Sequence, residues 1–259
     1  INNTSGCLNF IRKASAYGIR PIIGIDFRNS AEQCYVGLAK NNDGFLALNN
    51  FLSEHLYQKK DFPEKAPIFT NCFIIYPFEK VLLLDKTSFL AYEFIGIKLN
   101  EIHKLRFSKL SGLTDKLVVL HTVTFQNRRD FNTHRLLRAI DTNMLLSKLP
   151  EAQQGNPEQK MYPFQTIEKA FENHPYILEN TRLVLSQCSI EFDFSKTKES
   201  QNLKCVFSSP EEDYKKLLSL CQLGLPMRYD AVTLIIRQRL EKELALIKQQ
   251  NFVSFFLIN

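Results

Sequence analysis

The chain has 259 residues, of which 44% are apolar and 12% aromatic, enough to bury the core of one large domain or two smaller ones. This composition excludes a chain that is disordered throughout. The formal net charge of +6 is only a mild lean toward polyanions such as nucleic acid, and no apolar run approaches the roughly 20 residues that a membrane-spanning helix needs.

The opening residues read as half of a βαβ unit. A polar turn precedes an amphipathic helix with Leu8, Ile11 and Ala14 on one side. Gly18 is placed to end this helix, and a strand is expected at residues 21–27. The strand that should come first is missing and the sequence does not begin with Met, so we expect a piece of a longer chain.

Strands and helices continue to alternate up to residue 187. A turn at 41–44 separates the second strand from the second helix, and Asp130 is placed to cap a later helix. This alternation predicts an α/β fold with a mixed or mostly parallel sheet. The expected strands cover 33–39, 72–76, 94–99 and 116–125, and the expected helices cover 45–57, 131–146, 166–173 and 175–187.

Composition changes near residue 195. The segment Ser195 to Asn202 is charged and poor in apolar residues, so we expect a linker between an α/β domain at 1–195 and a helical region at 196–259. Helices are expected at 214–221 and 230–249. The apolar cluster at 252–258 needs a covering partner, so this end is also expected to be cut.

The cysteines do not form a recognisable metal-binding or disulfide motif. The six cysteines show no Cys-x-x-Cys spacing and no flanking histidines, which argues against a zinc knuckle or a disulfide framework and favours reduced thiols in a cytosolic protein. The cysteines are Cys7, Cys34, Cys72, Cys188, Cys205 and Cys221.

Four segments, taken in order, carry a more specific pattern. The first is Gly-Ile-Arg-Pro-Ile-Ile-Gly-Ile-Asp-Phe at 18–27 with Val-Gly-Leu-Ala-Lys-Asn-Asn-Asp-Gly-Phe at 36–45. The second joins 117–125 to Arg-Asp-Phe-Asn-Thr-His at 129–134. The third runs from 161 to 188, and the fourth runs from Arg-Leu-Glu-Lys-Glu-Leu at 239–244 to the apolar cluster. Together they resemble the N-terminal region of the alpha subunits of bacterial DNA polymerase III, which are C-family DNA polymerases.

The resemblance implies a fold and a parent enzyme. Residues 1–195 would form a polymerase and histidinol phosphatase (PHP) domain, a distorted barrel of strands ringed by helices, here without its first strand. Residues 196–259 would be a linker and the mainly helical start of the polymerase palm. The parent would be a DNA-directed DNA polymerase, a cytoplasmic nucleotidyltransferase of replication or repair. Its implied partners are primer-template DNA, deoxynucleoside triphosphates, the sliding clamp and other holoenzyme subunits, with no membrane.

The PHP site itself is expected to be degenerate. An active PHP domain holds two or three metal ions with His, Asp, Glu and Cys ligands, whereas the resemblance places Ile1, Thr122 and Thr124 at ligand positions. Asp26, at a Glu position, is a vestigial candidate, and one carboxylate cannot hold a metal cluster. His121 is expected to point to the sheet face opposite Thr122.

Polymerisation is expected to use residues that the chain does not contain. The resemblance places the palm carboxylates that bind Mg²⁺ beyond Asn259, so the fragment alone should be inactive and bind no cofactor. Arg128 and Arg129 are the best candidates for DNA contact. Two alternatives remain: a free-standing degenerate PHP-like interaction domain, and an active metal-dependent PHP phosphoesterase or exonuclease.

Overall fold

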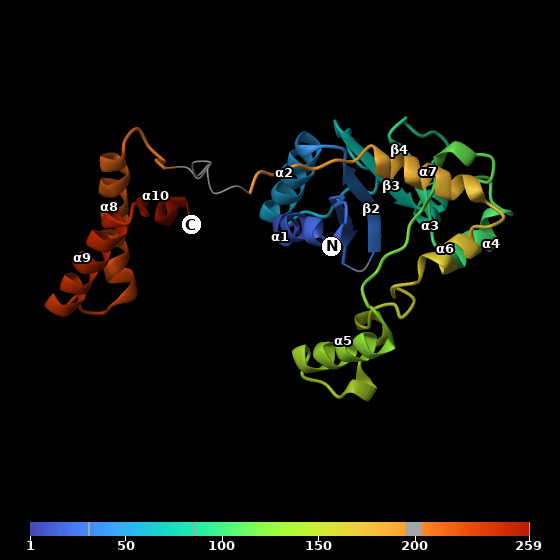
Figure 1. Cartoon of the computed structure of the whole chain (residues 1–259). Helices are drawn as coiled ribbons and strands as arrows, with labels where there is room; N and C mark the ends of the chain where they lie inside the picture. The colour runs from blue at the N-terminus through green and yellow to red at the C-terminus, as the bar shows by residue number, and fades with distance from the viewer. Residues whose placement is uncertain (31, 85, 195–203, 259) are drawn as a thin grey trace. The chain divides into compact units, whose positions relative to one another are not determined.

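A computed structural model describes residues 1–30, 32–84, 86–194 and 204–258. The chain divides into two units, Ile1–Phe194 and Ser195–Asn259 (Figure 1). The expected linker from Ser195 to Asn202 lies outside the described residues.

A five-stranded sheet forms the centre of the first unit, in the order β1-β2-β3-β4-β5. The pairs β1–β2 and β2–β3 are antiparallel, and β3–β4 and β4–β5 are parallel, so the expected mixed α/β sheet is confirmed. Within the described residues no pairing joins β1 to β5, and the sheet is open. The strands are β1 Gly24–Asn29, β2 Glu32–Ala39, β3 Cys72–Pro77, β4 Glu93–Ile97 and β5 Leu117–Val119.

The last strand is shorter than predicted. The sequence predicts a strand at 116–125, but β5 ends at Val119. The Leu120 amide still donates to the Ile97 carbonyl at 3.0 Å, whereas the Thr124 and Phe125 amides both donate to the carbonyl of Gln159, at 2.8 and 3.0 Å. The backbone therefore leaves the sheet after residue 120, because its hydrogen bonds go to another loop.

Helices surround the sheet and fill the second unit. The α-helices are α1 Cys7–Ala14, α2 Asn42–Gln58, α3 Phe78–Leu83, α4 Ile102–Leu105, α5 Arg128–Asp141, α6 Phe164–Ala170, α7 Pro175–Ser186, α8 Pro210–Arg228, α9 Leu234–Gln249 and α10 Val253–Ile258. Helix α1 is followed by a short 3₁₀ turn that ends at Gly18, whose φ of 64° suits a residue without a Cβ.

One predicted helix cap is wrong. Helix α5 begins at Arg128, and its cap is Asn127, whose side chain accepts from the amides of Arg129 and Asp130. Asp130 instead accepts from the amide of Gln126 at 3.1 Å. Asn and Asp are both strong N-caps, and the hydrophobic pattern alone placed the helix start three residues late.

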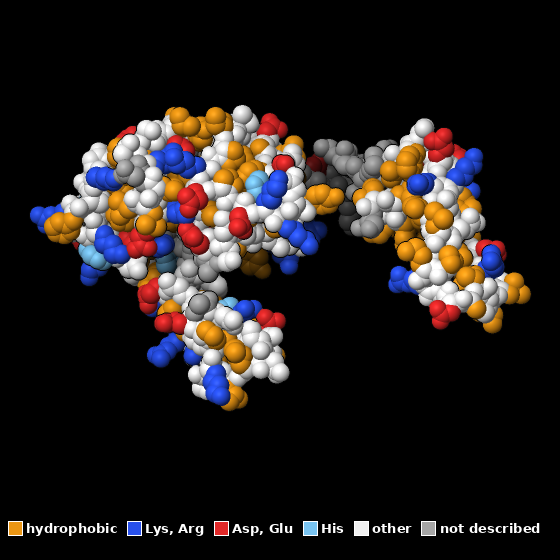
Figure 2. Space-filling view, turned by 180° about the vertical axis from the view of Figure 1, so that it is seen from behind, with side chains coloured by type: hydrophobic (Ala, Val, Ile, Leu, Met, Phe, Trp, Pro, Cys, Tyr) orange, Lys and Arg blue, Asp and Glu red, His pale blue; other side chains and the backbone are white. Residues whose placement is uncertain are grey.

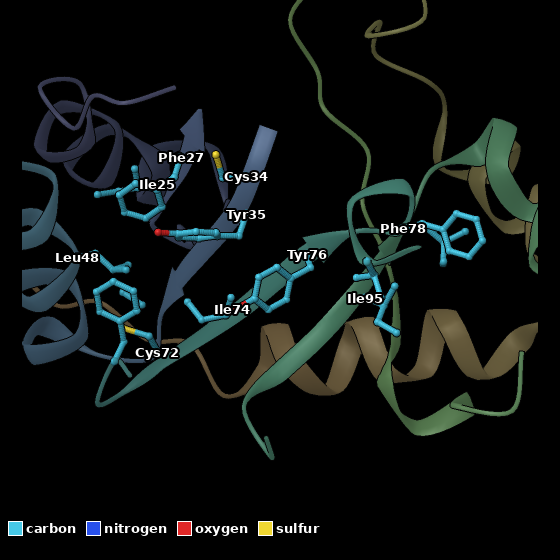
Figure 3. Close-up of a cluster of buried hydrophobic side chains, with 14 of the residues drawn as sticks. Ile25, Phe27, Cys34, Tyr35, Leu48, Cys72, Ile74, Tyr76, Phe78 and Ile95 are labelled. Carbon is cyan, nitrogen blue, oxygen red and sulfur yellow. The ribbon is translucent and has the colours of Figure 1, made fainter. Parts of the chain in front are cut away.

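Hydrophobic clusters cover both faces of the sheet. On one face Phe27, Tyr35, Tyr76 and Ile95 are fully buried (Figure 3). On the other face the smaller cluster contains Phe73, Ile75, Val118, Leu120, Val184 and Cys188, the last two from α7 and the residue just after its C-cap. The alternation of side chains along each strand produces the two faces.

Helix α7 covers the edge of β5. The Thr181 hydroxyl accepts from the Val119 amide at 2.8 Å, and the Asn180 amide donates to the carbonyls of Leu117 and Thr114, at 2.9 and 2.7 Å. These side chains satisfy backbone groups that an edge strand would otherwise leave open.

Two buried tyrosines in the core differ in their hydrogen bonds. The hydroxyl of Tyr76 donates to Glu93 at 3.1 Å and accepts from the Ala66 amide at 3.0 Å, whereas the Tyr35 hydroxyl is buried without a partner in the described structure. Tyr76→Phe should lower the free energy of unfolding by about 1 to 3 kcal/mol, because it leaves the Ala66 amide unsatisfied. Tyr35→Phe should be neutral or stabilising, since it removes an unpaired buried hydroxyl.

Urea unfolding of the two variants, followed by circular dichroism, measures this difference. The two substitutions remove the same atom from the same face of the sheet, so each serves as the control for the other. An equal loss of stability in both variants would contradict the distinction.

The second unit is a helical assembly in which α10 packs on α8. The Asp213 carboxylate on α8 accepts from the amides of Val206 and Phe207, at 2.8 and 2.7 Å. Burial opposes ionisation of Asp213, but these hydrogen bonds lower its pKa below the ordinary value. Figure 2 shows many hydrophobic side chains on the surface of α8, α9 and α10. In the described part of the chain no helix is both long and apolar enough to span a membrane.

Candidate functional site

A pocket of about 80 Å³ lies beyond the carboxyl ends of the parallel strands β4 and β5. Ligands of α/β sheets bind preferentially at this edge, which makes the pocket the candidate site. Its walls come from the residues after β4, the residues after β5 and the loop before α6. The residues that line it include Lys98, His121, Thr122, Glu158, Gln159 and Tyr162.

Polar groups of this pocket are bonded to one another and to the backbone. His121 Nε2 lies 2.8 Å from the carbonyl oxygen of Lys160, and the Tyr162 hydroxyl donates to Glu158 at 2.7 Å. The hydrogen bond to Glu158 raises the pKa of Tyr162 above its ordinary value. Lys98 pairs with Glu101 at 3.4 Å. The pocket therefore presents amides, hydroxyls and paired charges, a set suited to hydrogen bonding.

Thr122 and His121 line the same pocket. The expectation that His121 points to the sheet face opposite Thr122 depends on a strand that continues through both residues, and it stays a prediction. Alternation applies within a strand, and β5 ends before both residues. The hydroxyl of Thr124 donates to the Gln159 side chain at 2.9 Å. Both threonines are neutral groups, and Thr124 is engaged by the loop that closes the pocket.

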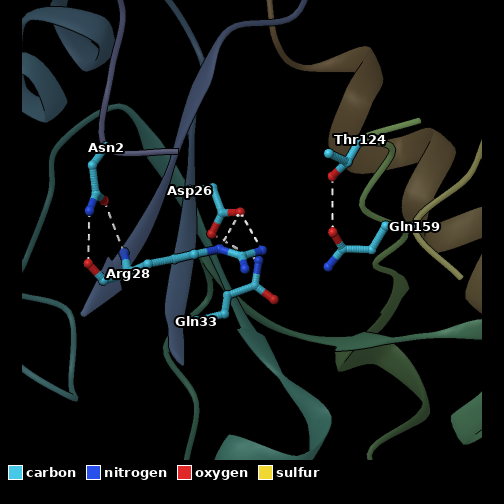
Figure 4. Close-up of polar contacts among 6 residues, drawn as sticks. All are labelled: Asn2, Asp26, Arg28, Gln33, Thr124 and Gln159. Atoms are coloured by element: carbon cyan, nitrogen blue, oxygen red, sulfur yellow. Dashed lines mark hydrogen bonds and ion pairs between the residues drawn. The ribbon is translucent and has the colours of Figure 1, made fainter. Parts of the chain in front are cut away.

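Asp26 lies in the middle of β1 with both carboxylate oxygens bonded (Figure 4). Arg28 Nε and Nη2 approach Oδ2 at 3.0 and 2.9 Å. The Gln33 amide on β2 donates to Oδ1 at 2.9 Å. The guanidinium supplies the positive charge that a metal ion would supply to a carboxylate in an active site, and it holds the carboxylate in a fixed position.

Asn2 joins the N-terminal segment to the same strand. Its side-chain amide donates to the Arg28 carbonyl at 2.8 Å and accepts from the Arg28 amide at 2.9 Å, and its backbone amide donates to the Asp26 carbonyl at 3.1 Å (Figure 4). Ile1, at one of the expected ligand positions, is 64% exposed.

Asp26 and the two threonines are not brought together as ligands. Asp26 belongs to β1 and the threonines follow β5, the two edge strands of the sheet. Figure 4 draws two separate hydrogen-bonded groups, one around Asp26 and one at Thr124. Within the described ranges, no group of three His, Cys, Asp or Glu residues could hold a metal ion. These residues do not fit the metal cluster of an active PHP domain.

Arg128 and Arg129 both lie in the exposed first turn of α5. Neither has a hydrogen bond or ion pair with the pocket residues or with Asp26 in the described structure; the Arg129 amide bonds to the cap Asn127 at 2.8 Å. Their role in DNA contact stays a prediction.

Sequence reasoning found Asp26 and missed the residues around it. The spacing of Asp26 and Arg28, two residues apart in one strand, was a usable signal, because such residues share a sheet face. Gln33 and Asn2 could not be found in this way, since the β1–β2 register and the path of the N-terminal segment are tertiary features.

No protein-family model matches the chain, but comparison with curated proteins finds bacterial DNA polymerases. The chain is 25% identical to DNA polymerase III subunit alpha of Bacillus subtilis over 98% of its length, and 24% identical to that of Haemophilus influenzae over 99%. It is also 26% identical to an error-prone DNA polymerase of Symbiobacterium thermophilum over 55% of its length. The chain spans about a quarter of the length of the alpha subunits it matches.

The similarity thus lies with bacterial DNA polymerases as a class. Within this class, the resemblance to the DNA polymerase III alpha subunit extends along nearly the whole chain.

Proposed function

We propose that the chain is a piece of a DNA polymerase III alpha subunit whose parent protein performs template-directed DNA synthesis in replication or repair. The observation that carries this proposal is similarity to alpha subunits from different bacteria along 98% to 99% of the chain. The parent would use Mg²⁺ held by palm carboxylates beyond Asn259. In this assignment residues 1–195 are the PHP domain, and 196–259 are the linker and the start of the palm.

Within that parent the chain acts as a scaffold without a catalytic centre of its own. The open sheet would be part of the distorted PHP barrel. The ion pair between Asp26 and Arg28 supports this role, because a carboxylate already neutralised by a guanidinium has little to gain from a metal ion. The neutral hydroxyls of Thr122 and Thr124 are poor ligands for a catalytic metal.

The same assignment implies binding partners for the parent protein. They are primer-template DNA, deoxynucleoside triphosphates, the sliding clamp and other polymerase III holoenzyme subunits, in the cytoplasm. Arg128 and Arg129 are the residues of α5 that we assign to DNA contact, because they are exposed cations in one helical turn.

Metal addition tests the scaffold role. A bound metal ion would stabilise the folded state and raise the melting temperature. Because we propose that the chain holds no metal centre, Mn²⁺, Zn²⁺ or Mg²⁺ at about ten times the protein concentration should leave the melting temperature unchanged. The matched control is Asp26→Asn, which should respond to metal in the same way as the unchanged chain. A melting temperature that rises with metal in the unchanged chain and not in Asp26→Asn would reveal a working ligand and overturn the inert assignment.

Primer extension by the complete gene product tests the polymerase assignment separately. We expect extension of a primed template that requires Mg²⁺ and all four deoxynucleoside triphosphates. A complete product that folds but extends no primer would contradict the assignment and favour an interaction domain.

A further inference from the structure

A groove of about 440 Å³ lies on the second face of the sheet, away from the candidate site. Phe73 of β3 and Phe94 of β4 line it from the sheet, Lys40 and Lys116 flank β2 and β5, and α7 supplies a wall with Leu183. It lies near the starts of β4 and β5, whereas the candidate pocket lies beyond their ends.

Aromatic rings in this groove are covered by cations. The rings of Phe73 and Phe94 form an edge-to-face pair with centroids 5.7 Å apart. Lys40 Nζ lies 4.1 Å from the centroid of Phe73, and Lys116 Nζ lies 5.5 Å from that of Phe94. An ammonium group lies over each ring, and the Phe94 ring is only partly buried. A ligand that displaces the tip of Lys116 could therefore reach the Phe94 ring without unpacking the core.

Charge in the groove favours an anion. Lys40 has no ion pair within the described structure, and Lys116 donates to the carbonyl of Leu90 at 2.9 Å. Among the described residues that line the groove, Asp115 is the one carboxylate. Two ammonium groups therefore face the groove with one opposing charge, and both can turn toward a phosphate.

We propose that this groove binds single-stranded nucleic acid, with Lys40 and Lys116 on the phosphates and bases stacked on Phe94 and the half-buried Tyr92. Flat rings interleaved with lysines are the usual platform for unpaired bases. The groove has the volume of a small-molecule site, which admits a nucleotide or two and not the side of a duplex. The proposal does not depend on the polymerase assignment, because it rests on these side chains alone.

Fluorescence anisotropy with a labelled oligothymidylate tests the groove. The double variant Lys40→Gln with Lys116→Gln should weaken binding about 10-fold and flatten the dependence on salt concentration, because about two phosphate contacts are lost. The matched control, Lys13→Gln with Lys60→Gln, removes the same charge from exposed positions of the same unit and should weaken binding less than about 3-fold.

A gain of affinity provides a second measurement that does not depend on the stability of the double variant. Leu183 is 61% exposed on the groove wall, so Leu183→Lys should fold and bind the oligonucleotide about 3-fold more tightly through one further phosphate contact. Equal losses in the double variant and its control would overturn the proposal, as would an unchanged affinity in Leu183→Lys. Tighter binding of a duplex, or of a glutamate-rich peptide, would replace the proposed ligand with that partner.

Discussion

Lys86→Ala is expected to lower the free energy of unfolding by about 3 kcal/mol or more. Lys86 pairs with Glu93 at 3.1 Å, and the two side chains are only 15% and 6% exposed. Glu93 also accepts from the Tyr76 hydroxyl and the Leu90 amide, at 3.1 and 2.8 Å. Removing the lysine would leave a buried carboxylate without its counter-ion, which costs far more than an exposed pair contributes.

Lys104→Ala is the matched control for this prediction. Lys104 pairs with Glu79 at a shorter distance of 2.7 Å, but both side chains are about half exposed, at 50% and 54%. Solvent screens such a pair, so its loss should lower the free energy of unfolding far less than the loss of Lys86 does. Adding Glu93→Gln to Lys86→Ala should recover part of the loss, because the buried charge disappears. Equal losses for Lys86 and Lys104 in urea unfolding would mean that burial does not decide the strength of these pairs.

Gly44→Ala is expected to lower the free energy of unfolding by about 3 kcal/mol, because the added methyl group would overpack against rigid backbone. A Cβ at this position of α2 would lie 2.0 Å from the carbonyl oxygen of Asn71. That carbonyl accepts from the Lys40 amide at 2.9 Å, and Asn71 is held at a φ of 57°. The obstacle is therefore a fixed backbone group, which cannot move aside as a side chain could.

Gly112→Ala is the control for the effect of a methyl group alone. It belongs to the same unit, and a Cβ there meets nothing within 4 Å. We expect a change of less than about 0.5 kcal/mol, since the site is open. Thermal melting of both variants measures the difference. A small effect in Gly44→Ala would show that α2 can shift away from the loop at Asn71.

Short-range sequence patterns predicted those strands and helices whose structure is decided by neighbouring residues in the sequence. The strand expected at 72–76 is β3, and the helix expected at 175–187 is α7, each correct to within one residue. Their boundaries follow from a buried apolar run and from Pro175 at the first helical position. The strand expected at 116–125 was too long, because its apolar residues continue beyond Val119 while its backbone bonds turn to Gln159.

The candidate site was less accessible to sequence reasoning. Asp26 was predicted as a residue of interest, and its ion-pair partner Arg28 lies two residues away in the same strand. The Gln33 amide, however, comes from a second strand, and Asn2 bonds the Asp26 backbone from the N-terminal segment. Its hydrogen bond to Gln33 and its link to Asn2 depend on register and chain path, for which no short-range pattern exists. Likewise, the groove on the second face joins residues from five separate segments, and their proximity is a property of the fold.

Asn2 and α7 together have a consequence for aggregation. Asn2 occupies outward backbone groups of β1 at Asp26 and Arg28, and Asn180 and Thr181 occupy those of β5 at Leu117 and Val119. At these positions neither edge of the sheet offers free donors and acceptors to a strand from another molecule. Two chains in concentrated solution should therefore not join their sheets edge to edge, and trimming the first few residues should make such joining easier.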